Sequence, residues 1–300
     1  MKKNGKRSGI QRYFCLDCQQ SFSSNRRPQR LQQAIFNDYF YHRYTLDELA
    51  AKYHYSRQWI QEKIHTYQPH TKQRVPREVI LVLDATFFGK RIDKFGLIIA
   101  KDVITLEPVS YHFITTESIK EYKRLRYDIE AQGFNIKAIT IDGKRGLFRL
   151  FADIPIQMCH FHQQAILTRY LTKNPKLQAS IDLKRICSHL GKVSAKRFSI
   201  LLVCWHKRHE TFLKVKTYNP DTNKWHYTHR RVRSAYRSLI SNLPYLFTYK
   251  KYPELEIPNT TNHLDGGLFA PMKMLLKIHR GISIEMKKKL IMDYLENIGK

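Results

Sequence analysis

The chain has 300 residues and a mass of 35.8 kDa, and its 53 Lys and Arg against 25 Asp and Glu give a formal net charge of +28. Such an excess predicts a polyanionic partner, while 42% hydrophobic residues are enough for packed cores and argue against a wholly disordered chain. No stretch approaches the roughly eighteen apolar residues of a membrane helix, and the N-terminus leads into no apolar signal core. Five cysteines in so long a chain form no disulfide scaffold, so we expect a cytoplasmic protein without a membrane partner.

The positive charge is unevenly distributed. The net charge is +9 over residues 1–78, +2 over 79–164, +16 over 165–252 and +1 over 253–300. A surface charged only for solubility has its charge spread evenly, whereas here two basic segments flank a nearly neutral, strand-rich middle. This distribution indicates an enzyme that binds nucleic acid. Six aromatic residues of the third segment either stack on bases or pack between helices: Tyr170, Trp205, Phe212, Trp225, Tyr227 and Tyr236.

Residues 1–28 contain Cys15-Leu16-Asp17-Cys18, a spacing typical of one knuckle of a zinc ribbon. A closed structural zinc site needs four ligands, and nothing upstream of Cys15 supplies the missing two. Either the first knuckle was lost by truncation or start-site choice, or the pair are ordinary thiols; a composite site with Cys159 and His162 is a third alternative. We predict a partial zinc-ribbon segment whose Zn²⁺ site has an incomplete ligand set.

Residues 29–68 have the pattern of three short helices. Apolar residues recur at helical spacing over 31–40, Thr45-Leu46-Asp47-Glu48 is a capping box that begins a second helix, and Ser56 caps a third. In the third helix Ile60 and Ile64 face inward, and three side chains suited to base edges face out: Arg57, Gln58 and Gln61. This layout predicts a helix-turn-helix whose last helix enters the major groove, although any small three-helix unit shares the periodicity.

A basic linker over 69–78 leads into residues 79–164, the first part of an α/β core. We expect strands over 79–84, 95–103, 108–116 and 136–141, with a helix over 117–132 before the fourth strand. This order is that of a ribonuclease H-like fold, in which the first and fourth strands are neighbours. Asp84 ends the first strand and Asp142 follows the fourth, so the two acids would meet.

Two carboxylates held close repel each other and raise each other's pKa unless a cation lies between them. A hard, oxygen-seeking ion such as Mg²⁺, or Mn²⁺ in its place, suits such a pair. Two ions about 3.5 to 4 Å apart would activate an attacking water or hydroxyl and stabilise the leaving oxygen at a phosphodiester. The alternative is that Asp84 merely ends a strand and that Asp142-Gly143 forms a turn.

Several motifs together resemble a known family. They are Asp84 after its strand, Asp142-Gly143 with Gly146-Leu147, Cys159-His160-Phe161-His162, Asn259-Thr260-Thr261-Asn262 with Leu264-Asp265-Gly266, and His279-Arg280-Gly281. With these motifs the chain is similar to Mutator-type bacterial insertion-sequence transposases of the DDE/D class, in the variant with an N-terminal zinc-binding module. The resemblance implies a catalytic, Mg²⁺-binding triad of Asp84, Asp142 and Asp265.

In this triad Asp265 replaces the Glu usual in the wider superfamily. Because Asp is one methylene shorter, its helix must lie closer to the other acids, or a second ion must be held partly by water. Asp265 could instead be a helix N-cap, and Glu254 or Glu256 could supply the third acid.

Cys159 and His162 match the family's Cys-x-x-His signature. Too few ligands surround them for a local zinc site, so we expect a structural or DNA-contacting His162 and consider a merely buried Cys159 as the alternative.

The 123 positions between Asp142 and Asp265 exceed what the core needs, so residues 165–252 form a basic, mostly helical insertion. Residues 253–300 then complete the core with the third acid and a C-terminal helix. The resemblance implies that such an insertion packs over the active site and contacts DNA ends, with arginines on an expected helix over 228–243: Arg230, Arg231, Arg233 and Arg237.

The working hypothesis is an insertion-sequence transposase associated with the nucleoid. A homo-oligomer binds double-stranded DNA, both the terminal inverted repeats of the element and its target, then hydrolyses a phosphodiester at each end and transfers the strand. The alternatives are a catalytically inactive DNA-binding regulator derived from a transposase, and a nuclease or RNA-processing enzyme of the same fold. The helix-turn-helix argues against the last, because it reads duplex DNA.

Overall fold

The computed structural model describes residues 1–7, 10–23 and 28–298, so residues 8–9 and 24–27 of the expected zinc-ribbon segment lie outside the described part. The chain divides into two compact units, Met1–His70 with Leu275–Asp293, and Thr71–Met274 with Tyr294–Lys300. We expected residues 253–300 to complete the core as one segment, and the structure instead divides them between the two units. No helix in the described part of the chain is both long and apolar enough to cross a bilayer.

The N-terminal strands of the first unit form a small antiparallel sheet in the order β1 (Lys2–Arg7), β2 (Ile10–Phe14), β3 (Ser21–Ser23). Cys15 follows β2, and its N–H donates to the carbonyl of Gln20 at 2.9 Å across the turn that carries Cys18. Backbone N–H groups of Cys18 and Asp17 lower the pKa of the Cys15 thiol, which favours the thiolate that metals bind. Within the described residues neither thiol belongs to a group of three or more close metal-ligating side chains, and Zn²⁺ binding stays a prediction.

Three helices follow, α1 (Pro28–Phe40), α2 (Leu46–Tyr53) and α3 (Arg57–Thr66). The predicted capping box is confirmed, since Glu48 N donates to Thr45 Oγ1 at 3.3 Å and Thr45 N donates to Glu48 Oε2 at 2.7 Å. Ser56 caps α3 by accepting a hydrogen bond from the backbone N–H of Trp59 at 3.2 Å. The burial of Ile60 and Ile64 is also as predicted, and the outward residues are exposed: Arg57, Gln58 and Gln61.

The segment 275–293 joins these helices through α13 (Ala270–Ile278) and α14 (Ile284–Asn297). Asp293 of α14 accepts hydrogen bonds from the hydroxyls of Tyr67 at 2.6 Å and Tyr41 at 2.9 Å. His279 bonds to the carbonyl of Phe40 at 2.9 Å. A buried carboxylate with two hydroxyl donors holds this part of α14 on the three-helix unit.

The second unit is built on a five-stranded mixed sheet in the order β6-β5-β4-β7-β8. Neighbours β4, β5 and β6 are antiparallel, whereas β7 runs parallel to β4 and β8 parallel to β7. The predicted adjacency of the first and fourth core strands is thus confirmed, and the order agrees with the ribonuclease H-like expectation. The strands are β4 (Glu78–Phe88), β5 (Phe95–Asp102), β6 (Pro108–Ile114), β7 (Asn135–Ile141) and β8 (Ile156–Met158).

One face of this sheet is covered by α4 (Ile119–Ala131), with α5 (Arg145–Leu150) beside it. Tyr122, Leu125 and Ile129 are buried at helical spacing, so α4 presents a single apolar stripe to the apolar side chains of the sheet. Ser118 accepts a hydrogen bond from Glu121 N at 3.4 Å and begins the helix close to the predicted position. The sheet and its helices make one core, which fixes the ends of β4 and β7.

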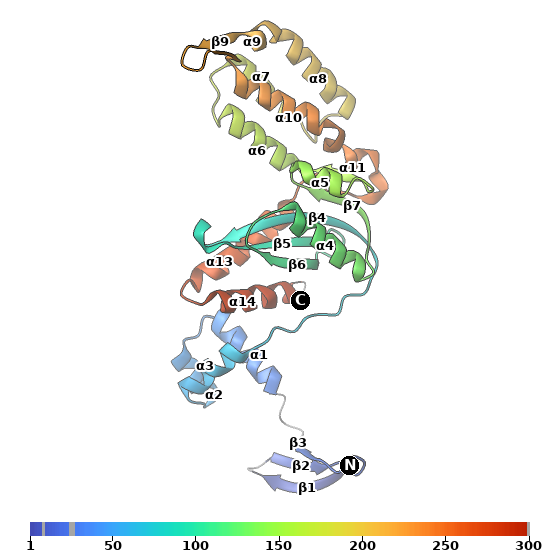
Figure 1. The fold of residues 1–300 in the computed structure, drawn as a ribbon. Coiled ribbons are helices and arrows are strands. Elements are labelled where there is room, and N and C mark those ends of the chain that lie inside the picture. Colours follow the sequence, from blue (N-terminus) through green and yellow to red (C-terminus); the bar gives the residue numbers. More distant parts are fainter. Residues whose placement is uncertain (8–9, 24–27, 299–300) are drawn as a thin grey trace. The chain divides into compact units, whose positions relative to one another are not determined.

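The predicted helical insertion forms a second core of its own (Figure 1). Its exit is tied to the sheet because the carbonyl of Leu246 bonds to His160 Nε2 at 2.7 Å and accepts from Gln157 Nε2 at 3.1 Å. The short extended piece expected at 225–227 is one arm of a hairpin. The elements are α6 (His160–Leu171), α7 (Gln178–Cys187), α8 (Ala195–Arg208), α9 (Glu210–Lys214), β9 (Lys216–Asn219), β10 (Lys224–Tyr227), α10 (Arg230–Leu246) and α11 (Thr248–Lys251).

Candidate active site

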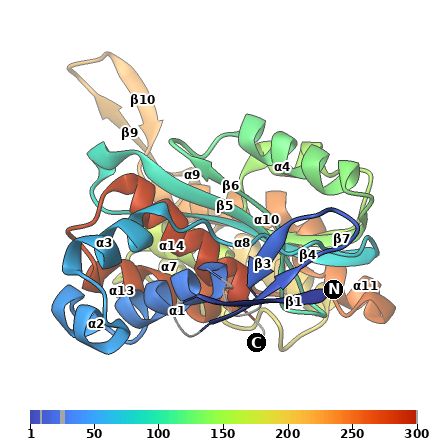
Figure 2. The same cartoon turned by 90° about the horizontal axis from the view of Figure 1, so that it is seen from below.

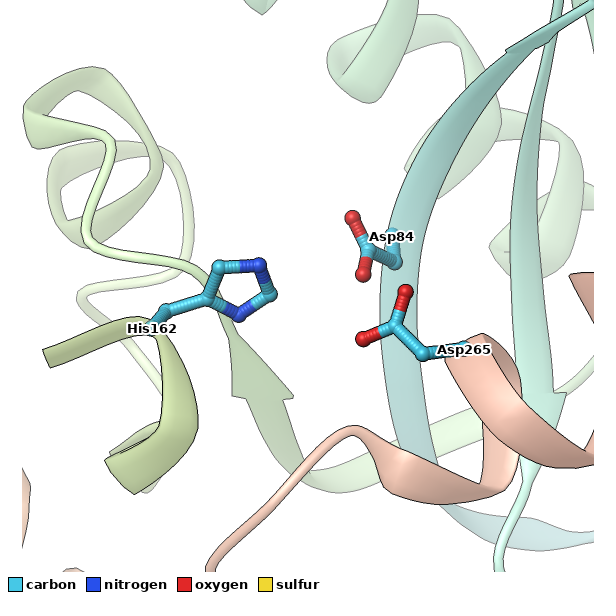
Figure 3. Close-up of side chains that lie close together, drawn as sticks. All are labelled: Asp84, His162 and Asp265. Atoms are coloured by element: carbon cyan, nitrogen blue, oxygen red, sulfur yellow. The ribbon is translucent and has the colours of Figure 1, made fainter. Parts of the chain in front are cut away.

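Asp84, His162 and Asp265 converge from three distant parts of the chain. One ligand atom from each side chain lies within 4.8 Å of those of the other two. Figure 3 shows the carboxylate on β4, the carboxylate of the C-terminal segment and the imidazole of α6 facing a common space. Two of the three predicted acids therefore lie together, and the third member of the group is a histidine. Glu254 and Glu256, the alternative third acids, are exposed and lie outside the group.

Asp84 lies within β4, opposite Ile99 of β5, and its residue is only 9% exposed. Its Oδ1 accepts a hydrogen bond from Ala85 N at 2.7 Å. The pKa of Asp84 is raised to about 7, mainly by burial and to a smaller extent by the charges of Asp265 and Asp142, while His162 and the Ala85 N–H oppose the rise. A carboxyl group so placed favours a bound proton or a nearby cation.

Asp142 follows β7, and its placement differs from our expectation. If the parallel pairing that ends at Val82 and Thr140 is continued by two residues, Asp84 lies opposite Asp142. The Asp142 carboxylate, however, accepts a hydrogen bond from Lys144 N at 3.1 Å and is not a member of the mutually close group. Such a local side-chain turn directs an Asp along its own backbone. Burial raises the pKa of Asp142, with Glu117 adding to the effect.

Asp265 is positioned by a loop that is bonded to the core. The carbonyl of Pro258 accepts from Thr140 Oγ1 at 2.7 Å, and that of Asn259 accepts from His160 N at 2.8 Å. Thr261, fully buried, donates from its hydroxyl to Asp265 Oδ2 at 3.4 Å. Asp265 has helical backbone angles and follows α12 (Asn262–Leu264) directly, so it is not a helix N-cap. It begins a π-helical turn, Asp265–Phe269, a geometry that recurs at functional sites.

His162 lies in the first turn of α6 and is positively charged at neutral pH. Its interaction with Cys159 is the largest cause that raises the pKa of His162 to about 9; Asp84 and Asp142 also raise it, and burial opposes them. Its Nδ1 is buried without a hydrogen-bond partner among the described residues. We expected a structural or DNA-contacting histidine, and the structure adds a position against two carboxylates. The only sequence signal was the Cys-x-x-His spacing, which does not reveal that neighbour.

Cys159 is fully buried and connects the start of α6, through Thr261, to Asp265. Its Sγ accepts from Thr261 N at 3.3 Å and lies 3.4 Å from Thr261 Oγ1. Burial alone would raise the pKa of the Cys159 thiol, but interactions with His162 and Thr261 outweigh it and lower the pKa. The buried thiol of the alternative interpretation is therefore present, and it also joins two parts of the site.

Glu117, which the sequence analysis did not single out, lies beside the second acid. Its carboxylate pairs with Lys144 Nζ at 3.1 Å and accepts from the Tyr122 hydroxyl at 3.1 Å. Lys144 also donates to the backbone carbonyl of Glu117 at 2.8 Å. An acid just before a helix is common, so the sequence position of Glu117 did not predict its ion pair with Lys144 or its effect on Asp142.

A cavity of about 630 Å³ is lined by Gly143, which follows Asp142 in the chain, and by residues of α6 and α10. We call it the basic cleft, and none of the described residues that line it is acidic. Ser234, Ser238 and Ser241 share one face of α10 along it, and four arginines surround it: Arg145, Arg169, Arg231 and Arg237.

The predicted DNA-binding arginines of α10 therefore separate into three environments. Arg231 and Arg237 line the basic cleft, and Arg230 is exposed. Arg233 instead donates to the carbonyl of Leu213 at 2.8 Å and lies over the Tyr227 ring. Arg233 therefore stabilises the insertion through contacts within it.

The donor set fits a hard divalent cation. Two carboxylates supply oxygen ligands that suit Mg²⁺ and Mn²⁺. The His162 imidazole could supply a nitrogen ligand, which Mn²⁺ also accepts, only after losing its proton. The raised pKa values of Asp84 and Asp142 indicate clustered, buried carboxyl groups whose ionised forms a cation would stabilise.

Comparisons with known proteins give distant structural likenesses. The sequence matches no protein-family profile and no curated protein. The structure is similar to one titled "Drosophila P element transposase strand transfer complex", at 10% identity over 94% of this chain and 80% of that one, with a TM-score of 0.33. It is also similar to a chain of the simian T-cell lymphotropic virus intasome in complex with PP2A regulatory subunit B56 gamma, at 11% identity over 53% and 69%, with a TM-score of 0.23. Both likenesses are distant, and the ribonuclease H-like character of the core follows from its sheet order.

Proposed function

We propose that this protein is a metal-dependent DNA transposase that cleaves element ends and transfers their strands. The observation that carries the proposal is the convergence of Asp84, Asp265 and His162 at the edge where Asp142 also lies. Buried acids on adjacent strands of a ribonuclease H-like sheet suit displacement at a phosphodiester.

In this proposal Asp84, Asp142 and Asp265 hold Mg²⁺ or Mn²⁺. When bound, such ions activate an attacking oxygen and stabilise the leaving oxygen. The chain's own residues set the charge of the site. Asp84 gives up its proton readily only above about pH 7, and the His162 imidazolium faces two carboxylates that would otherwise repel each other.

DNA binding divides between the two units of the chain. The exposed Arg57, Gln58 and Gln61 on α3 are suited to reading base edges of terminal inverted repeats. The basic cleft, with its four arginines and its serines, is suited to the phosphodiester backbone next to the reacting bond. If roughly eight phosphates are neutralised in all, the log-log salt dependence of binding has a slope of about −7.

One carboxylate site serves both chemical steps, because hydrolysis and strand transfer differ only in the nucleophile. Water attacks first and frees a 3′-hydroxyl, which then attacks target DNA at the same site. No covalent enzyme intermediate is required. A homo-oligomer that binds two element ends would join both to one target, as expected for a Mutator-type transposase.

A catalytically inactive DNA-binding regulator is the second candidate. It is favoured by Asp142 lying outside the mutually close group and by Asp265 in place of Glu. A regulator of this kind would bind the same DNA and leave it uncut.

The test is cleavage of a labelled duplex carrying the element end, with Mg²⁺ or Mn²⁺. We expect Asp84→Asn, Asp142→Asn and Asp265→Asn to bind this duplex and not cut it, while the matched control Asp153→Asn, a surface carboxylate paired with Arg126, cuts normally. Full cleavage by Asp84→Asn and Asp142→Asn would refute the assignment. Binding without cleavage by the unmodified chain with either ion would favour the regulator.

A further inference from the structure

The structure separates the six aromatic residues of the insertion whose role the sequence left open. Trp205 is buried and donates from its indole N–H to the carbonyl of Ala179 at 2.9 Å. Tyr236 stacks on Trp205, and Phe212 stacks on His229. These rings pack between helices, whereas Trp225 is 66% exposed. A large ring this exposed is not part of the core of the insertion.

Trp225 lies on the β9–β10 hairpin, which extends away from the helices of the insertion (Figure 2). The antiparallel register pairs Trp225 with Tyr218 and Tyr227 with Lys216. Directly paired residues and those two positions away share a face of a hairpin, so all four side chains lie on one face. The rings of Tyr218 and Trp225 have centroids 5.2 Å apart, and Tyr218 is 42% exposed.

The hairpin is held in shape by its own bonds. At the tip Asn219 Oδ1 accepts from Asp221 N at 2.9 Å, and the Tyr218 hydroxyl donates to Asn223 Oδ1. At the base Thr228 N donates to the carbonyl of Val215 at 3.0 Å. Arg233 braces the same end, since its guanidinium lies 3.6 Å from the centroid of the Tyr227 ring. The aromatic pair is therefore presented without a large ordering cost on binding.

Charge indicates the occupant of this face. The hairpin belongs to a segment with a net charge of +16. Lys216 lies on the same face as the two exposed rings, and Lys224 precedes Trp225 on the opposite face. The two ring planes are tilted by 53°, so the more exposed Trp225 ring offers the larger stacking face. An exposed aromatic face near a cation complements a nucleobase next to its phosphate, and stacking tolerates any base because every base has a π-face. In an intact duplex neighbouring bases occupy those faces. Bases of an overhang or a strand break lack such neighbours.

We infer that the Tyr218–Trp225 face of the hairpin stacks on unpaired bases of the bound DNA. This inference rests on the DNA binding in the proposed function and does not require its catalysis. The substrate feature that it adds is an unpaired segment, such as an overhang or a frayed end, in addition to the duplex.

The test uses the full-length chain with Asp84→Asn, so that DNA is not cut, and short DNAs with 2-aminopurine in a single-stranded overhang. We expect binding to quench the 2-aminopurine fluorescence. Trp225→Ala should remove the quenching and weaken binding of the overhang DNA by roughly 5- to 100-fold, the loss of about one base stack. Binding of a fully paired duplex of the same sequence should stay unchanged.

Two variants serve as controls. Trp225→Phe keeps an aromatic face and should retain most of the quenching, and Val203→Ala removes another exposed apolar side chain and should change nothing. Equal quenching with Trp225→Ala, or an equal loss of affinity for paired and overhang DNA, would overturn the inference. So would a change of oligomeric state with Trp225→Ala in analytical ultracentrifugation without DNA, because the face would then contact a second copy. These measurements report binding only. If the protein proved unable to cleave DNA, the proposed catalysis would fail while these outcomes would still test the stacking.

Discussion

Replacing Asp84 by Asn should stabilise the metal-free protein, and more so as the pH rises. Asn keeps the acceptor for Ala85 N and removes the ionisable group from a position that is 9% exposed. In the folded chain the pKa of Asp84 is raised to about 7 from an ordinary 3.8, so the folded state binds this proton more tightly than the unfolded state. The folded chain therefore loses stability as the pH rises from 3.8 to about 7.

The magnitude follows from the size of that shift. A difference of about three pKa units corresponds to about 4 kcal/mol when the group is fully ionised, as an upper bound. About 1.5 kcal/mol of it is already lost by about pH 5, so the advantage of the variant should grow by about 2 to 3 kcal/mol between about pH 5 and pH 8. Comparing two pH values cancels any constant effect of the Asn side chain itself.

Urea unfolding followed by Trp205 fluorescence measures this difference, because Trp205 lies in the same unit as Asp84. The other two tryptophans are replaced by Phe in both proteins. A second measurement adds Mg²⁺. The ion should raise the free energy of unfolding of the unmodified protein, because it binds the ionised carboxylates, and should have little effect on Asp84→Asn. A stability difference that does not change with pH, together with equal responses of both proteins to Mg²⁺, would refute both the burial argument and the metal site.

Three further predictions concern Cys159, Thr261 and the basic cleft. Cys159→Ala should lower the pKa of His162 from about 9 towards its ordinary 6.5, because Cys159 is the largest cause of the shift; an NMR titration of the imidazole checks this, and an unchanged pKa contradicts it. Thr261→Val removes the buried hydroxyl that bonds to Asp265, so we expect about 1 to 3 kcal/mol of lost stability and a weaker response to Mg²⁺, whereas Thr168→Val on the exposed part of α6 should cost little. Arg237→Gln in the basic cleft should reduce the salt slope of DNA binding by about one, measured by fluorescence anisotropy; an equal reduction by Lys207→Gln on α8 would argue against a specific role for the cleft.

Local rules predicted those elements whose signals lie close together in the chain. The cap at Ser56 and the box at Thr45 each span only four residues, and the structure contains both. The adjacency of β4 and β7 followed from the order of strands, because few topologies accommodate that order. The exposed face of α3 followed from its helical period.

The remaining features depend on distant partners, which no short pattern reveals. The position of His162 requires α6 to lie near Asp84, and the placement of Asp265 requires a loop bonded to Thr140 and His160. The difference between buried Trp205 and exposed Trp225 is a tertiary fact of the same kind. The grouping of residues 275–293 with the N-terminal helices depends on the bonds of Asp293 to tyrosines far away in sequence.

The Asp proposed as the third acid, Asp265, and the Cys-x-x-His pair have one physical explanation. An Asp in place of Glu reaches less far, so its backbone must be held close to the first acid. Cys159 bonds to Thr261, Thr261 bonds to Asp265, and three residues after Cys159 the His162 ring faces the Asp84 and Asp265 carboxylates. The first turn of α6 therefore binds the loop that carries Asp265 and also places a cation that faces both carboxyl groups. If this explanation is right, Asp265→Glu overfills the site unless Thr261 is also changed, and the double variant Asp265→Glu, Thr261→Ala should recover more cleavage than Asp265→Glu alone.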